Sequence, residues 1–114
     1  YEITTRLVGS EMCIRDRITP NVWHYEAMQQ TDQYIVWAED GEGSSVEAND
    51  HKTEQSITGT IDLFTMTEFD PAADAIQDVL KENRISFYLN SVQYESRDDG
   101  YAGYIHYEWV FEVA

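Results

Sequence analysis

The sequence predicts an α+β fold, in which a mainly antiparallel sheet of four or five strands carries one helix, over about residues 71–84, on one face. Residues 104–113 alternate between apolar and polar side chains apart from Val110, and residues 55–67 alternate apart from Phe64, which is the pattern of strands with one buried face. Apolar residues at helical spacing follow Asp70-Pro71, a favourable N-cap and first-turn pair. The chain has 114 residues, which is room for one domain.

Shorter segments supply the remaining strands. Residues 22–25 and 34–38 are aromatic and β-branched, so we expect a strand in each. Residues 39–53 contain glycines, serines and carboxylates with no apolar period, and predict a long loop. Gly59 lies within the expected strand 55–67 and indicates either a bulge or the close approach of a packed element.

Apolar side chains occupy both faces of the strand expected over residues 85–94. Phe87 and Leu89 belong to one face, whereas Val92 and Tyr94 continue the other. One helix cannot cover both faces of such a sheet, so either a second helix or another subunit covers the rest. The residues expected at a subunit interface are Tyr34, Val36, Tyr88, Val92 and Tyr94.

The composition excludes several classes of protein. Seven Lys and Arg residues against 22 Asp and Glu residues give a net charge of −15, which disfavours binding to nucleic-acid phosphates or to anionic lipid. The single cysteine excludes an internal disulfide and a cysteine-based zinc site. Aromatic residues make up 13% of the chain, enough to order it in spite of its charge.

No motif in the sequence indicates catalysis, a cofactor or a metal, and we expect a protein that is not an enzyme. The three histidines, His24, His51 and His106, belong to three different predicted elements. His51 has Asp50 and Glu54 nearby, but the spacing matches no known ligand pattern, so a solvated acidic loop is the preferred interpretation.

The N-terminal segment differs from the rest of the chain. Residues 1–17 carry no net charge, so the whole charge of −15 lies on residues 18–114. The run LVGSEMCIRDR, residues 7–17, resembles translated sequencing-adapter DNA, and the chain starts at Tyr1 rather than Met. We therefore expect residues 1–17 to be a non-native segment and residues 18–114 to be the domain. The open alternative is a genuine short helix with Ser10 as its N-cap.

Stretches such as ITPNVWHYEA (18–27), EQSITGTIDLFTMTEFDPAADAIQDVL (54–80) and GYIHYEWVFEV (103–113) resemble small tail proteins of siphophages that infect Gram-positive bacteria, of the tail-terminator or tail-completion type. The resemblance implies an N-terminal helix before strand 22–25 and a sheet packed by helices. It also implies a hexameric ring that caps the tail tube, stops its polymerisation and meets the head connector. Its partners would be further copies of the chain, the tube protein and the connector protein, in the virion tail after assembly in the host cytoplasm.

The negative charge suits such a ring, because duplex DNA must pass through it without binding. Carboxylates repel phosphates over a screening length of about 8 Å at physiological salt. The residues expected to line or rim the lumen are Glu39, Asp40, Glu42, Glu47 and Asp50. An open sheet edge at residues 34–38 could pair with a neighbouring subunit. The alternative function is an acidic interaction module that imitates DNA.

Overall fold

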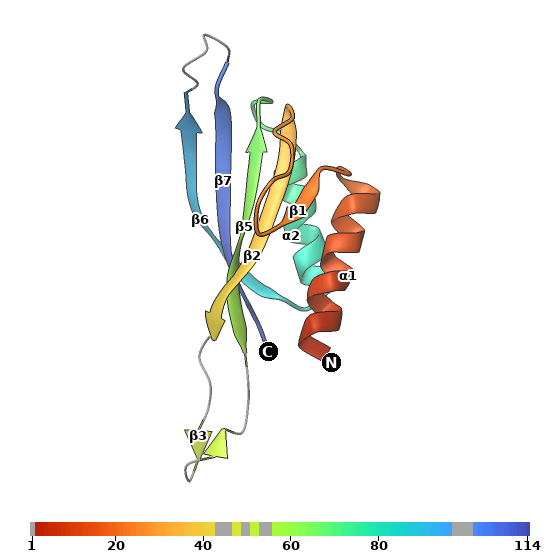
Figure 1. The fold of residues 1–114 in the computed structure, drawn as a ribbon, viewed down its shortest axis with the longest axis vertical. Coiled ribbons are helices and arrows are strands. Elements are labelled where there is room, and N and C mark those ends of the chain that lie inside the picture. The colour runs from red at the N-terminus through yellow and green to blue at the C-terminus, as the bar shows by residue number, and fades with distance from the viewer. Residues whose placement is uncertain (1, 43–46, 49–50, 53–55, 97–101) are drawn as a thin grey trace.

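The computed structural model describes residues 2–42, 47–48, 51–52, 56–96 and 102–114, and confirms the α+β class. Two helices lie on one face of a five-stranded mixed sheet (Figure 1), whose strands are ordered β1-β2-β5-β7-β6. Strand β1 runs parallel to β2, and every other neighbouring pair in this sheet is antiparallel. The elements are α1 (Glu2–Arg17), β1 (Val22–His24), β2 (Gln33–Glu42), β3 (Glu47–Ala48), β4 (His51–Lys52), β5 (Ile57–Thr65), α2 (Ala72–Glu82), β6 (Ser86–Glu95) and β7 (Tyr104–Val113).

Helix α1 is longer than the short helix considered from the sequence. Ser10 is not its N-cap but lies inside it, where the hydroxyl donates to the Arg6 carbonyl at 2.9 Å. Leu7 and Ile14 are buried against the sheet, so α1 completes the core. A helix therefore stands before β1, where the resemblance implies one, while the non-native origin of residues 1–17 stays a prediction.

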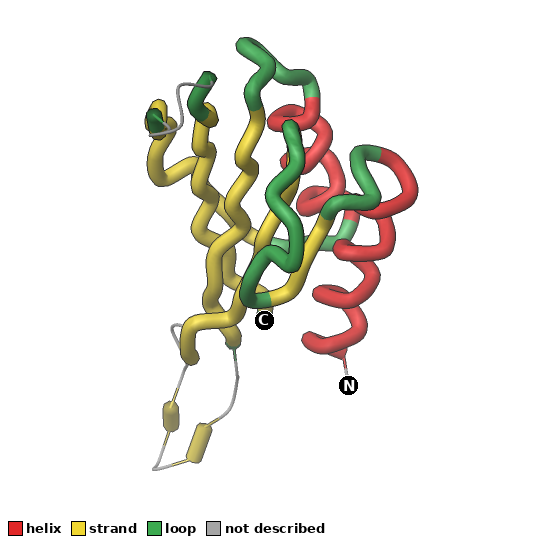
Figure 2. The backbone as a smooth tube through the Cα atoms, turned by 45° about the horizontal axis from the view of Figure 1, so that its top comes forward, coloured by secondary structure: helices red, strands yellow, loops and turns green. Residues whose placement is uncertain are grey.

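The long loop expected over residues 39–53 is wrong in part. Strand β2 continues through Glu39 to Glu42, and the short strands β3 and β4 pair beyond it (Figure 2). These polar residues can pair with β5 because backbone hydrogen bonds between strands need no apolar side chain. The register shifts between Glu39 and Gly41, which marks a β-bulge in β2. A Cβ at Gly59 would lie 2.2 Å from the Ala38 carbonyl oxygen, so the expected close approach is confirmed.

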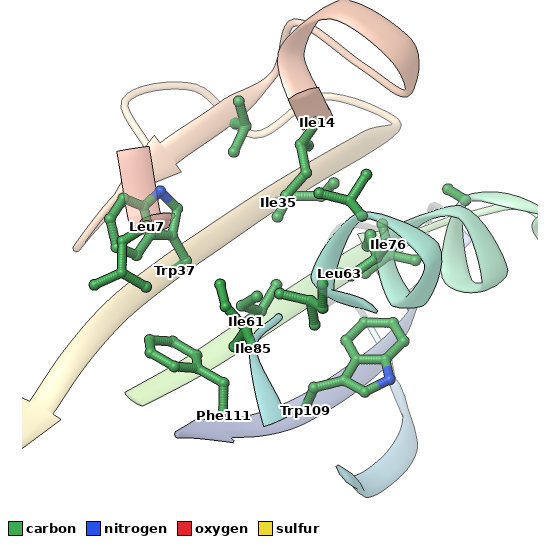
Figure 3. Close-up of a cluster of buried hydrophobic side chains, with 14 of the residues drawn as sticks. Leu7, Ile14, Ile35, Trp37, Ile61, Leu63, Ile76, Ile85, Trp109 and Phe111 are labelled. Atoms are coloured by element: carbon green, nitrogen blue, oxygen red, sulfur yellow. The ribbon is translucent and has the colours of Figure 1, made fainter. Parts of the chain in front are cut away.

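Helix α2 begins one residue later than the sequence predicts, with Pro71 rather than Asp70 at the N-cap and Ala72 as its first residue. The Asp70 carboxylate accepts a hydrogen bond from the Ala72 N–H at 2.9 Å and so satisfies one of the free donors of the first turn. The apolar stripe of α2 packs with Ile14 of α1 and with the inward side chains of the central strands, Trp109 among them (Figure 3). Both helices therefore share one core on one face of the sheet.

Strand β6 departs from its predicted pattern. Leu89 faces Trp109 and Val92 faces Tyr107, with a register shift between Leu89 and Ser91. Because the bulge inserts one extra residue, Val92 and Tyr94 lie on the same face as Leu89, the face that carries the helices. Their assignment to the opposite face was wrong, since a simple alternation cannot register a bulge.

The second face of the sheet, here called the outer face, carries neither helix. Both α1 and α2 pack on the opposite face (Figures 1 and 2), so the helix that was not predicted, α1, does not cover the outer face, which α2 also leaves uncovered. The expected open edge at residues 34–38 is also wrong, because β1 pairs with Ile35, Val36 and Trp37 of β2. Neither described helix is long and apolar enough to cross a membrane.

Candidate functional site

The most exposed apolar surface of the sheet lies along β6, which is an edge strand. The exposed fractions are 59% for Tyr88, 46% for Leu89, 50% for Val92 and 66% for Tyr94. Leu89, Val92 and Tyr94 share the helix-bearing face, whereas Tyr88 pairs with Val110 on the outer face. These four residues are called the β6 strip. Because β6 has β7 on one side only, its other side presents unpaired backbone groups beside the strip.

The β6 strip borders a groove that α2 leaves open. Phe69 and Ala73 at the start of α2, together with Leu89, Tyr107 and Trp109 of the sheet, line this groove. Trp109 is fully buried, and its indole N–H has no hydrogen-bond partner among the described residues. An unsatisfied buried donor costs roughly 1–3 kcal/mol, so a group that supplied an acceptor here would be favoured.

The opposite edge of the sheet is protected. Strand β1 has three residues, and Arg15 of α1 donates to the Val22 carbonyl at 3.0 Å and to the Pro20 carbonyl at 3.1 Å. A short strand whose carbonyls are occupied by an arginine is a poor template for further pairing. Strand β6 has ten residues and carries the bulge between Leu89 and Ser91, but no side chain in the described part of the chain binds its free edge as Arg15 binds β1.

The structure divides the expected interface residues into two groups. Tyr88, Val92 and Tyr94 are exposed on the β6 strip. Tyr34 is only 5% exposed and Val36 is half-buried, because both lie within the sheet on β2 rather than at its edge. Burial, with smaller contributions from neighbouring groups, raises the pKa of Tyr34 to about 12. An interface role for any of these residues stays a prediction.

Aromatic side chains of three strands pack together on the outer face. The Tyr34 ring stacks on Phe64 with centroids 4.7 Å apart, and Phe64 stacks on His106 at 4.2 Å. Tyr104 meets Tyr34 edge to face at 5.5 Å, and its hydroxyl donates to the Thr31 carbonyl at 2.8 Å. The cluster links β2, β5 and β7 without any helix above it.

His106 stands beside this aromatic cluster among carboxylates. Its Nε2 lies 2.7 Å from Asp62 Oδ1 and its Nδ1 lies 2.6 Å from Glu95 Oε2. Burial works against a charged imidazole, but the hydrogen bonds to the two carboxylates outweigh it and raise the pKa of His106. Burial also raises the pKa of Asp62, against the hydrogen bond from His106, and the facing Glu108 acts in the same direction as burial. The sequence carries no signal that connects these residues, although Asp62, His106 and Glu108 each fall on the polar face of a predicted strand.

The structure places only some of the residues expected at a lumen. Glu39 forms an ion pair with His24, and Asp40 accepts from the Thr58 hydroxyl at 2.8 Å. Burial alone would raise the pKa of Glu39, but the hydrogen bond from His24 lowers it below the ordinary value. Glu42 ends β2 and Glu47 begins β3, while Asp50 lies outside the described residues. The described backbone thus places Glu39, Asp40 and Glu42 on β2 and Glu47 on β3 (Figure 1).

The helix-side core offers no room for a substrate in the described part of the chain. The cavity between α1 and the sheet, lined by Leu7, Ile14 and Trp37 among others, has a volume of about 10 Å³. That volume admits at most a single water molecule. The surface that distinguishes this domain is therefore its sheet edge.

The fold and this surface define an α+β protein with one long, apolar, unprotected sheet edge. No family model and no curated protein matches the chain. Among solved structures, a chain from the tail of an empty GTA particle, determined by helical refinement with C6 symmetry, aligns over 72% of this chain and 75% of that chain, with 11% identity and a TM-score of 0.27. An alignment at that TM-score carries no argument about fold or function.

Proposed function

We propose that the chain is a structural subunit of a siphophage tail, of the tail-terminator type, and not an enzyme. In this role it forms a ring on the tail tube, ends tube polymerisation and contributes to the surface that joins head and tail. The resemblance of residues 18–114 to tail-terminator proteins supports the proposal from the sequence. The single structural observation that carries it is the β6 strip on an unprotected edge.

A second copy of the chain is the occupant that suits this edge. A neighbouring chain can pair with the free backbone of β6 and cover Leu89, Val92 and Tyr94 in one step. Each of these partly exposed side chains would contribute roughly 1–2 kcal/mol on burial. Because the opposite edge is short and occupied by Arg15, the neighbouring subunit would meet β6 with another of its surfaces, which makes the contact non-reciprocal. Non-reciprocal contacts between identical chains close into a ring when the rotation between neighbours closes.

The same proposal assigns a role to the negative charge of the chain. Glu39, Asp40, Glu42, Glu47 and Asp50 would face the DNA passage and repel its phosphates. Replacing them together by Gln or Asn should slow DNA passage and reduce infectivity while rings still form. Unchanged infectivity with intact rings would remove the lumen from the proposal but leave the ring.

Sizing with light scattering tests the assembly directly. The wild-type chain should show a larger species as its concentration rises, and Val92→Lys and Tyr94→Lys should each reduce that species. Gln93→Lys is the matched control, because Gln93 is exposed on the same strand but pairs with His106 on the outer face. Electron microscopy with purified tail tubes should show the wild-type chain at tube ends.

A different outcome would favour the rival function. An acidic module that imitates DNA should stay small at all concentrations and bind basic proteins in a salt-sensitive way. A chain that remains monomeric with and without tail tubes, or an assembly that Val92→Lys and Gln93→Lys disturb equally, would contradict the proposed role of the β6 strip.

A further inference from the structure

The outer face holds a group of potential metal ligands that the proposed assembly does not use. Asp62 of β5, His106 of β7 and Glu108 of β7 each offer a ligand atom, and these atoms lie within 4.8 Å of one another. The three side chains are half-buried, and Asp62 pairs directly with Glu108 across neighbouring strands. Like charges in that position repel each other, so the arrangement calls for a positive charge between them.

The described residues supply little positive charge at this point. Glu95 adds a third carboxylate to the group, and Glu95 and Asp62 both lie within hydrogen-bond distance of the His106 imidazole. Within the described residues, no Lys or Arg forms an ion pair with Asp62, Glu95 or Glu108. Among these residues the imidazole is therefore the one cationic group in contact with the cluster.

We propose that Asp62, His106 and Glu108 bind a divalent transition-metal ion of the zinc type on the outer face. Ligand atoms that share a zinc ion lie about 2.0–2.2 Å from it and hence at most about 4.3 Å from each other. His106 Nε2 and Asp62 Oδ1 lie 2.7 Å apart, within that limit, and the ligand atom of Glu108 lies within 4.8 Å of both. An imidazole with two carboxylates suits zinc, cobalt or nickel better than magnesium or calcium, which prefer oxygen ligands alone.

The groups around the three ligands are those that support a metal site. Glu95 lies 2.6 Å from His106 Nδ1, which leaves Nε2 directed toward Asp62 as the ligand nitrogen. Asn90, at the bulge of β6, donates to Glu108 Oε1 at 2.8 Å and holds that carboxylate. Three protein ligands leave one position of a tetrahedral ion for water. The ion would join β5 and β7 directly and reach β6 through Glu95 and Asn90.

Calorimetric titration of the chelator-treated full chain with ZnCl₂ at pH 7 tests the site. We expect a stoichiometry of one ion per chain. His106→Gln, Asp62→Asn and Glu108→Gln should each weaken binding by roughly 100-fold or more, and Asn90→Ala by roughly tenfold. A magnesium titration under the same conditions should give no comparable heat.

Two histidine variants serve as matched controls. His24→Gln should leave zinc binding unchanged, because His24 pairs with the single carboxylate of Glu39. His51→Gln should also leave it unchanged. If His51→Gln abolishes binding while His106→Gln does not, or if the wild-type chain binds zinc no better than magnesium, the proposal is overturned.

Imidazole NMR of the wild-type chain keeps the test independent of variant folding. Zinc should shift the ¹⁵N resonance of His106 Nε2 and leave His24 unchanged, and a His106 signal unaffected by saturating zinc would refute the site. The sizing experiments on β6 use no added metal, so failure of either proposal can be recognised separately.

Discussion

The Asp70 carboxylate, 7% exposed, links the start of α2 to two strands. It accepts hydrogen bonds from Ala72 N–H at 2.9 Å, from Thr65 Oγ1 at 2.6 Å and from Gln33 Nε2 at 2.6 Å. With a net value of about 1 kcal/mol for each bond, Asp70→Ala should lower the free energy of unfolding by about 3 kcal/mol. Asp70→Asn keeps one acceptor oxygen but places a second donor group, the Asn NH₂, next to the Gln33 amide donor. It should lower the free energy of unfolding by about 1–2 kcal/mol.

The same contacts predict a dependence on pH. Burial alone would raise the pKa of Asp70, but the hydrogen bonds from Thr65, Ala72 and Gln33 lower it below its ordinary value of 3.8. A carboxyl whose pKa is lower in the folded state contributes stability that is present above the unfolded value and is lost as the pH falls through the folded value. The stability difference between the wild type and Asp70→Asn should therefore be constant from pH 7 to pH 5 and shrink below pH 4.

Urea unfolding followed by tryptophan fluorescence measures both effects, because Trp109 and Trp37 are buried reporters. Asp74→Asn is the matched control: it lies exposed in the first turn of α2 and should change stability by less than about 0.5 kcal/mol. Two results would refute this account of Asp70. One is a loss of less than about 1 kcal/mol in the free energy of unfolding of Asp70→Ala at pH 7. The other is a stability difference between the wild type and Asp70→Asn that stays unchanged down to pH 3.

The remaining predictions concern packing. Ile14→Ala should lower the free energy of unfolding in urea by about 2–4 kcal/mol, because Ile14 is 1% exposed in the core. Met12→Ala, on the solvent side of the same helix, should lower it by less than about 0.5 kcal/mol. Equal effects of the two substitutions would mean that α1 does not dock as described. Gly59→Ala should lower the free energy of unfolding, measured by thermal unfolding, by at least about 2 kcal/mol. The added Cβ would lie 2.2 Å from the Ala38 carbonyl oxygen and 2.5 Å from the Phe111 ring. An unchanged stability would show that β2 and β5 can separate at this position.

Local periodicity predicted those parts of the fold whose structure depends on few distant contacts. The alternation of β7 places Trp109 and Phe111 in the core as expected, and the Asp70 carboxylate binds the first turn of α2, although the N-cap itself is Pro71, one residue later than predicted. The extension of β2 beyond Ala38 could not be predicted, because its polar residues are held by pairing with β5 rather than by burial of their side chains.

The bulge in β6 had no signal in the sequence. The residue at the bulge is Asn90, which is neither a glycine nor a proline, the residue types that commonly mark an irregular strand. The bulge is defined by the register with β7, in which Leu89 pairs with Trp109 and Ser91 with Glu108. A pattern read along one strand cannot contain that information, and so Val92 and Tyr94 were assigned to the wrong face.

The cluster around His106 was missed for a related reason. Asp62 and His106 are 44 residues apart, and only the antiparallel register of β5 with β7 brings them together. Both residues did fall on the polar faces of strands that were correctly predicted. The register of β5 with β7, which places Asp62 opposite Glu108, is not encoded in either strand alone because α2 and β6 separate them in the chain, and the contact from Glu95 depends in addition on the bulge in β6.

The composition of β6 bears on why its edge is open. Charged residues make up 25% of the chain, yet β6 carries one, Glu95, at its very end. Monomeric proteins protect long edge strands with lysines, prolines, bulges or short length. Strand β6 has neither lysine nor proline and is ten residues long, although it carries the bulge between Leu89 and Ser91, whereas β1 at the other edge is short and bound by Arg15. In the described part of the chain the two edges therefore differ, and β6 is the edge at which a further strand could pair.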